Sequence, residues 1–176
     1  AREAAWAGGD GGEPGGGAVG EDVLQGGLRG ECPALSTARR AHDIRTALGL
    51  QEEFGFDLIL DGAAEAYLMT EEIAEADVPV ILHPTMARPS GTTQNAAFTT
   101  AGVLHDAGVP VAIQTGWEPY VPKTRIALYE AAIAMAHGLP REAALASITR
   151  EAAEILGLES VGTVAPGQRA DLALFD

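Results

Sequence analysis

Apolar and polar residues follow two recurring patterns along the chain from residue 33 onward. Short apolar runs that end in polar or small residues predict buried strands. Between these runs, apolar residues recur at intervals of three and four, which predicts amphipathic helices. The expected strands span 33–38, 56–62, 78–84 and 109–116, and the expected helices 39–55, 65–76, 96–108 and 126–137. Strands that alternate with helices of this length indicate parallel βα units in an α/β fold.

The first helix shows the pattern most clearly. Ile44, Leu48 and Phe54 are expected on one buried side, and Gly55 is expected to end the helix. Before the first strand the chain is rich in glycine, which loses the most conformational freedom on folding. We therefore expect residues 1–30 to be a flexible or irregular lead-in, 31–160 to be the βα portion, and 161–176 to begin a C-terminal β-segment.

Short βαβ units build both open doubly wound sheets and closed barrels. The expected strands end in polar or small residues: Ser36 and Thr37, Asp61 and Gly62, His83, and Gln114 to Gly116. Active-site groups of (β/α)8 barrels lie at this C-terminal end of the strands. The strand ends therefore favour a barrel.

Several segments closely resemble the amidohydrolase superfamily, in particular its imidazolonepropionase-like members. The matching segments are LRGECPALSTARRAHDIRTAL, LILDGAAEAY, GLPREAALASIT, AAEILGL and VGTVAPGQRADLALFD, in the family's order. This resemblance implies the C-terminal half of a (β/α)8 TIM-type barrel. The last segment would add, as ADLALF, the final strand of a small composite β-domain.

The resemblance also implies a hydrolase that acts on C–N bonds, other than peptide bonds, in linear or cyclic amides. Such enzymes hold zinc or a similar divalent metal, which activates a water molecule. The ligand positions of the fifth, sixth and eighth barrel strands fall at Thr37, Gly62 and Gly116, and none of these side chains suits zinc. We therefore expect no tightly bound metal in this chain. The alternative function is a non-catalytic pseudoenzyme that binds a small molecule or a partner subunit.

Activity would therefore need either a metal site made largely elsewhere or a metal-free mechanism that uses His83 and Asp61. The alternative for His83 is a packed, hydrogen-bonded histidine. Asp61 and Glu65 are spaced for acid–base work as a pair, although Glu65 also suits the first turn of a helix.

The loop after the fourth strand offers further candidates. Gln114, Trp117 and Lys123 are candidates for substrate binding, with a loop that only covers the barrel mouth as the alternative.

Charge and composition limit the partners. Lys and Arg total 11 against 25 Asp and Glu, a formal net charge of -14, which argues against nucleic acid and anionic membranes. The single Cys32 excludes an internal disulfide. There is no apolar stretch of the roughly 18 residues that a membrane span needs and no signal-peptide pattern, so we expect a soluble protein of unknown compartment.

Half a barrel would leave two open sheet edges. We therefore expect self-association, or a second chain that supplies the missing half.

Overall fold

The computed structural model describes residues 26–116 and 126–174. Its centre is one parallel sheet of four strands in the order β1-β2-β3-β4. The strands are β1 (Ala34–Ala38), β2 (Leu58–Gly62), β3 (Val80–Leu82) and β4 (Val111–Ile113). All four strands that the hydropathy pattern predicted are confirmed, each somewhat shorter than its apolar run.

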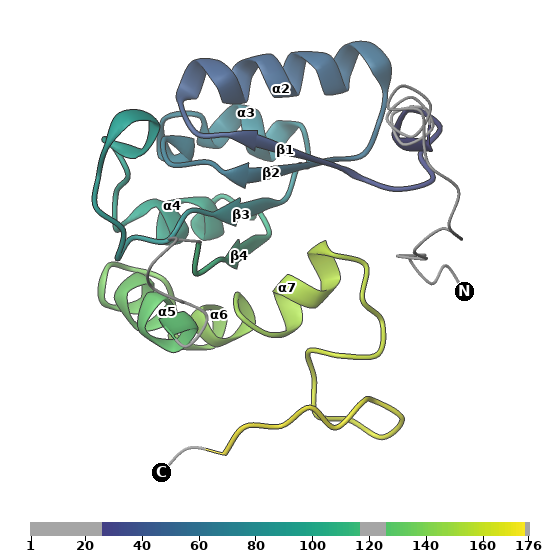
Figure 1. The fold of residues 1–176 in the computed structure, drawn as a ribbon, viewed down its shortest axis with the longest axis vertical. Coiled ribbons are helices and arrows are strands. Elements are labelled where there is room, and N and C mark those ends of the chain that lie inside the picture. Colours follow the sequence, from purple (N-terminus) through teal and green to yellow (C-terminus); the bar gives the residue numbers. More distant parts are fainter. Residues whose placement is uncertain (1–25, 117–125, 175–176) are drawn as a thin grey trace, which may run out of the picture.

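Helices connect the strands and continue after the last one (Figure 1). They are α2 (Ala41–Phe54), α3 (Thr70–Glu75), α4 (Thr100–Asp106), α5 (Ala127–Ala136), α6 (Arg141–Ala146) and α7 (Arg150–Ile155). Two short 3-10 helices, η1 (Ala66–Leu68) and η2 (Gly91–Thr93), lie in the loops.

The strand order is that of a barrel segment. Each strand pairs with the next one along the chain, whereas a doubly wound sheet reverses its order at a switch point. The helices α2, α3 and α4 lie on one side of the sheet (Figure 1). A parallel sheet with consecutive strands and its helices outside is consistent with part of a TIM-type barrel.

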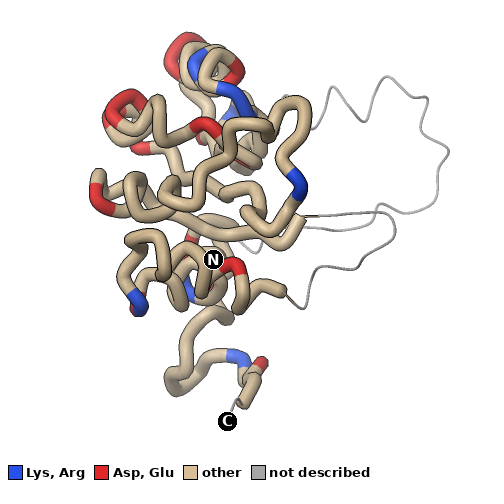
Figure 2. Tube along the Cα trace, turned by 90° about the vertical axis from the view of Figure 1, so that its left-hand side faces the viewer, with Lys and Arg blue, Asp and Glu red and all other residues tan. Residues whose placement is uncertain are grey.

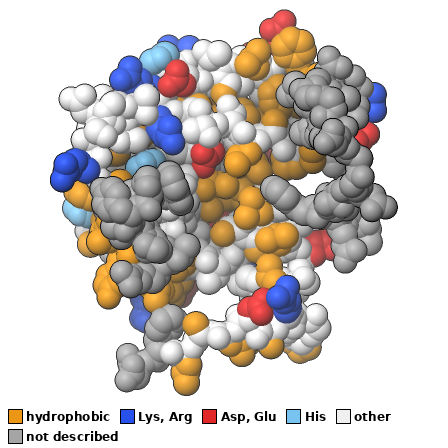
Figure 3. Space-filling model, viewed as in Figure 1, with side chains coloured by type: hydrophobic (Ala, Val, Ile, Leu, Met, Phe, Trp, Pro, Cys, Tyr) orange, Lys and Arg blue, Asp and Glu red, His pale blue; other side chains and the backbone are white. Residues whose placement is uncertain are grey.

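The two faces of the sheet differ in their surroundings. Leu60, Val80 and Val111 point toward the helices and belong to the main buried cluster, together with Ile44 and Leu104 from α2 and α4. Alternate residues such as Leu35 and Ile59 lie outside that cluster, and Leu35 is 57% exposed. Figure 3 shows hydrophobic side chains gathered over the strands on this open side. In a barrel this is the inner face.

Helix α2 follows the predicted pattern except at its end. Ile44 and Leu48 are buried, but Phe54 is 54% exposed, so its expected place in the core is wrong. Gly55 ends the helix at φ 68°, a left-handed conformation that glycine adopts without strain, and its N–H donates to the Gln51 carbonyl at 2.8 Å. Phe54 therefore lies in the last turn, where the chain is already leaving the core.

Two predicted helices form only in part. The stretch 65–76 divides into η1 and α3 at Thr70, whose hydroxyl donates to the Tyr67 carbonyl at 3.2 Å and so competes with regular helix bonding. The stretch 96–108 becomes helical only from Thr100, after a turn in which Thr100 N–H bonds the Ala97 carbonyl at 3.3 Å.

The expected final strand, ADLALF, is not formed in this structure. Residues 170–174 are irregular, and Leu172 and Leu174 are 69% and 100% exposed. A strand is held by hydrogen bonds to a neighbouring strand, and none of the described residues pairs with this segment in a sheet.

The described part of the N-terminal lead-in lies outside the sheet and its helices. Of the glycine-rich lead-in, residues 26–28 are helical, whereas 1–25 lie outside the described part.

Figure 2 shows acidic residues recurring on the helices, with few basic residues between them. Within the described ranges, no helix is long and apolar enough to cross a membrane.

Candidate functional site

The predicted strand ends meet at one end of the sheet. The register pairs Thr37 with Asp61, and Gly62 with Leu82. The N–H of His83 donates to the Gly62 carbonyl at 2.8 Å. Gly116 is the last described residue before the gap at 117–125. A side chain at Gly116 would meet the Pro84 ring at 2.7 Å, which places that loop beside the end of β3. The expectation that these residues share the C-terminal end of the sheet is confirmed.

The register shows which residue stands beside Thr37. Thr37 pairs with Asp61, and Gly62, to which the resemblance assigns the family's ligand position of this strand, pairs with Ala38. Because side chains alternate along a strand, Asp61 shares the open face with Thr37, whereas Gly62 faces the helices.

Asp61 is the centre of a hydrogen-bonded polar cluster. Its Oδ2 accepts from the Thr37 hydroxyl at 2.9 Å, and its Oδ1 accepts from the Gln114 side-chain amide at 2.7 Å. The three side chains come from β1, β2 and the end of β4, so the cluster spans the sheet. Both carboxylate oxygens are already engaged, and this fixes the orientation of Asp61.

His83 is held in one orientation at the end of β3. Its Nδ1 lies 2.8 Å from the Pro84 carbonyl. A carbonyl only accepts, so Nδ1 carries the hydrogen, and Nε2 of the neutral ring keeps its lone pair. Burial lowers the pKa of His83 below its ordinary value, against the opposing effect of the bond to Pro84, and the Arg39 cation lowers this pKa further. His83 is therefore neutral at pH 7, with Nε2 as a base.

Glu65 has a structural task and does not pair with Asp61. Its Oε2 accepts from the Ala41 N–H at 2.8 Å, and its Oε1 accepts from the Asn95 amide at 2.8 Å. These bonds, the one from Ala41 first, lower the pKa of Glu65. Glu65 thus caps the N-terminus of α2, a neighbouring helix, rather than the first turn of its own. Asp61 and Glu65 thus have separate sets of hydrogen-bond partners, which gives no support to the suggested carboxylate pair.

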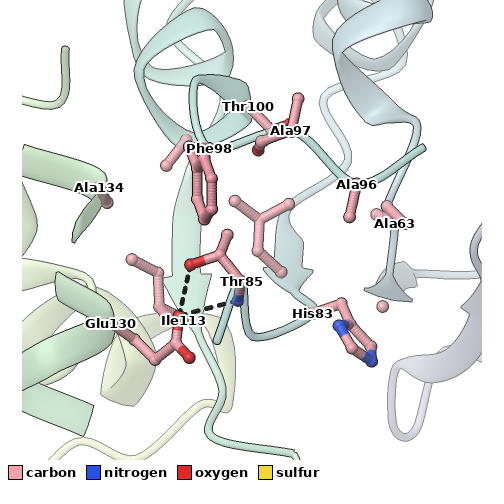
Figure 4. Close-up of a pocket in the computed structure, with 14 residues that line it drawn as sticks. Ala63, His83, Thr85, Ala96, Ala97, Phe98, Thr100, Ile113, Glu130 and Ala134 are labelled. Atoms are coloured by element: carbon pink, nitrogen blue, oxygen red, sulfur yellow. Dashed lines mark hydrogen bonds between the residues drawn. The ribbon is translucent and has the colours of Figure 1, made fainter. Parts of the chain in front are cut away.

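Sequence reasoning missed Glu130, which is 2% exposed on α5. Its oxygens accept three hydrogen bonds from the loop after β3: from the Thr85 N–H and hydroxyl at 2.8 and 2.7 Å, and from the Met86 N–H at 2.9 Å. Figure 4 shows Glu130 reaching from its helix to Thr85. The only sequence signal was a single acid in the otherwise apolar run ALYEAAIAMA. Glu130 positions the loop that begins at His83.

Two small cavities adjoin this loop. One of ≈ 20 Å³ lies between the sheet and helices α4 and α5, and has space for about one water molecule. The other, ≈ 90 Å³, lies beneath the loop after β3. His83, Thr85, Ala96 and Phe98 line both. In Figure 4 Phe98 stands over Thr85, and His83 lies on the side away from Glu130.

The described residues do not bring together a complete donor set for the metal that the family implies. Among the residues with described coordinates there is no group of three or more His, Cys, Asp or Glu side chains that could hold a metal ion. Thr37 and Gln114 donate to the Asp61 oxygens, and the Nδ1 of His83 donates to Pro84, so this ring has the Nε2 lone pair to offer. Trp117 and Lys123, two of the predicted substrate-binding residues, lie outside the described residues, whereas Gln114 is part of the polar cluster.

Comparisons with known proteins match this architecture. A family model described as "Amidohydrolase family" matches residues 25–176. Two curated relatives are imidazolonepropionases. The one from Paracoccus denitrificans is 37% identical over 86 residues, which are 48% of this chain and 22% of the relative. The one from Ruegeria pomeroyi is 45% identical over 75 residues, 42% of this chain and 19% of the relative.

A solved structure agrees with the same assignment. The chain is similar to the crystal structure of an amidohydrolase from Thermotoga maritima MSB8, with a TM-score of 0.79 and 34% identity. The match covers 85% of this chain and 39% of that one. The chain therefore spans well under half of the proteins that it matches.

Proposed function

The chain belongs to the amidohydrolase family, and from this premise we propose that it acts as a hydrolase of C–N bonds, other than peptide bonds, in small linear or cyclic amides. The observation that carries the proposal is the oriented, neutral His83 beside the Asp61 cluster at the C-terminal end of a parallel sheet. Barrel enzymes place their chemistry at that end. The printed name of the curated relatives adds ring amides of the imidazolone type to the substrates worth testing.

In the proposed mechanism His83 is the general base. Its Nε2 takes a proton from a water molecule as the water oxygen forms a bond to the amide carbon. The imidazolium then returns this proton to the departing nitrogen as the C–N bond breaks. Asp61 and Glu130 both favour the protonated ring through their negative charge, so they stabilise the imidazolium while it exists.

The proposal rests on proton transfer and on orientation by the described residues, and we assign no step to a metal. Thr37 and Gln114 hold Asp61 in place, and Glu130 holds the loop that follows His83. These are positioning roles, because none of these side chains is assigned a contact with the reacting atoms.

A second candidate function is a non-catalytic binding protein. The observation that favours it is that both Asp61 oxygens accept hydrogen bonds from within the chain, from Thr37 and Gln114, so that the carboxylate is held in one orientation. In that case the same strand ends would bind a small molecule without turnover.

The experiment is a hydrolysis assay on the chelator-treated chain with imidazolones, hydantoins, lactams and linear carboxamides, read as ammonia release or ring opening by NMR. We expect turnover of at least one class at neutral pH without added metal. Turnover that appears only after zinc is added would contradict the metal-free proposal. Saturable binding, by ligand-detected NMR, of a compound that is not turned over would favour the second candidate.

A further inference from the structure

The side chain of Arg39 lacks the partners that a half-buried cation ordinarily has. It follows β1, and its Nε is buried without a hydrogen-bond acceptor. Across the described residues, its side chain makes neither a hydrogen bond nor an ion pair. A guanidinium offers five N–H donors, and a buried donor without an acceptor costs free energy. Arg39 therefore has unused capacity to bind an anion.

Several other arginines of the chain are engaged. Arg45 lies 3.7 Å from a carboxylate oxygen of Glu72, and Arg169 lies 3.0 Å from one of Asp171. Arg40, the immediate neighbour of Arg39, donates to the Gly91 carbonyl at 3.3 Å. The exposed arginines that have no partner among the described residues, Arg88 and Arg141, can be solvated by water, whereas the Nε of Arg39 is buried.

The position of Arg39 connects it to the candidate site. A side chain at Gly62 would come within 3.1 Å of the Arg39 Cγ and 3.4 Å of its Nε, so the arginine lies across the space that the glycine leaves open. Gly62 accepts the N–H of His83 and lines the same cavity as His83. The Arg39 cation also acts on the His83 ring. Arg39 and His83 therefore flank one glycine at the C-terminal end of the sheet.

The nearby acids do not neutralise Arg39. Asp61 gives its oxygens to Thr37 and Gln114, and Glu65 gives its oxygens to Ala41 and Asn95. Neither of these acids forms an ion pair with Arg39 among the described residues. With a net charge of -14, the chain repels anions in general, so binding one requires a local cation.

We propose that Arg39 is a ligand-recognition residue that binds a carboxylate of the substrate beside His83. A guanidinium suits this task because its planar fork can donate two parallel hydrogen bonds to a carboxylate. This inference rests on the proposed function in one respect only: it identifies the carboxylate ligand as the substrate of the proposed hydrolase. It narrows the substrate class to small amides that carry a carboxylate.

Binding of a carboxylate at Arg39 should also change the pKa of His83. The bound carboxylate offsets the positive charge of Arg39, which is one cause of the lowered pKa of His83. The other charged groups that act on this ring, Asp61 and Glu130, keep their partners. A carboxylate at Arg39 should therefore raise the pKa of His83, whereas a purely structural arginine would give no such response.

The test uses propionate as the smallest suitable carboxylate and propionamide as its uncharged counterpart. In NMR titrations of the full chain, the Arg39 Nε–H signal, assigned by its absence in Arg39→Lys, should shift saturably with propionate and stay unchanged with propionamide. The pKa of His83, from its ring-proton shifts, should rise when propionate is bound. The titrations are made on the unaltered chain, with Arg39→Lys needed only for the assignment, and they do not depend on turnover.

Variants provide the matched comparison. Arg39→Ala should weaken propionate binding by about tenfold or more, and Arg141→Ala, which removes an exposed arginine on α6, should leave the affinity unchanged. The absence of a saturable shift with propionate, or equal binding of propionate by Arg39→Ala, would overturn the inference. The hydrolase proposal would then still stand on its own assay, because a neutral amide could be the substrate.

Discussion

The carboxylate of Asp61 accepts a hydrogen bond from the side-chain amide of Gln114 at 2.7 Å, although 53 positions separate the two residues. Asp61 is the second-last residue of β2 and Gln114 follows β4, with β3 between the two strands in the sheet. The bond therefore joins two strand ends across a third, and it helps define the open face of the sheet.

A substitution at Gln114 tests how much the hydrogen bond between Gln114 and Asp61 contributes to stability. Gln114→Glu places a second carboxylate against Asp61, and like charges at this distance repel. We expect the variant to lose about 1–2 kcal/mol of unfolding free energy at about pH 7, and to recover most of it at about pH 4, where one carboxyl is protonated. Chemical denaturation at both pH values tests this. Gln94→Glu, at an exposed position, is the control, and an equal loss in both variants would contradict the prediction.

Glu130 should be more important for stability than any surface acid. Glu130→Ala leaves the Thr85 N–H and hydroxyl and the Met86 N–H without their acceptor, so we expect a loss of about 2–3 kcal/mol in unfolding free energy. Glu142→Ala, on the exposed side of α6, should change it by less than about 0.5 kcal/mol. Urea denaturation compares the two variants. Similar stability of both would mean that the loop after β3 is held by other contacts.

The sheet and its open end were predictable from the sequence, whereas side-chain partnerships were not. Apolar runs such as VPVAIQTG indicated the strands because parallel strands buried on both faces show no alternation. The role of Glu130 could not be found, because its partners lie about 45 residues away in a loop. Arg39 was assigned to the start of a helix, since nothing in a sequence shows that a cation lacks an acceptor.

The expected final strand failed for a physical reason that the sequence does not record. ADLALF has the composition of a strand, but a strand forms only where another offers it hydrogen bonds. The register of the sheet could not be predicted either: Thr37 stands beside Asp61, and Gly62 stands beside Ala38. A one-residue shift changes the face on which a side chain lies.

Glu65 should make stability depend on pH in the acid range. Its pKa in the folded chain is lowered from an ordinary value of 4.5. A carboxyl group of this kind stabilises the fold above its unfolded pKa, and this contribution is lost as the pH falls through the folded pKa. We therefore expect Glu65→Gln to be less stable than wild type at about pH 6 and the difference to shrink below pH 4.5.

The control for this prediction is Glu75→Gln, which removes an exposed acid at the end of α3. Its stability should follow that of the wild type across the same pH range. Thermal unfolding followed by circular dichroism is sufficient. A Glu65→Gln deficit that stays constant down to about pH 3 would mean that the lost bonds, and not the charge, account for the difference.

The open edge at β1 leads to a prediction about association. We propose that the 176-residue chain does not behave as a well-folded monomer, because β1 has no partner on its outer side among the described residues and Leu35 on its open face is 57% exposed. At the other edge, Ile113 N–H is bonded to the Ser147 carbonyl at 3.1 Å, so β4 is partly protected. Sedimentation should show association.

Leu35→Lys should weaken this association, whereas Leu68→Lys, at a position with the same 57% exposure but on η1, should not. A concentration-independent, cooperative unfolding transition from a species of monomer mass would refute the prediction. The edge of β1 would then be covered within the chain itself.

The role of His83 is the central claim, and the pH dependence of kcat/KM tests it most directly. Because the pKa of His83 lies below 6.5 and the neutral ring is the base, kcat/KM for an accepted amide should rise with pH, bend below pH 6.5 and then stay level. His83→Ala should lower kcat/KM by about a hundredfold or more and abolish the bend. An unchanged bend and rate in His83→Ala would contradict the account.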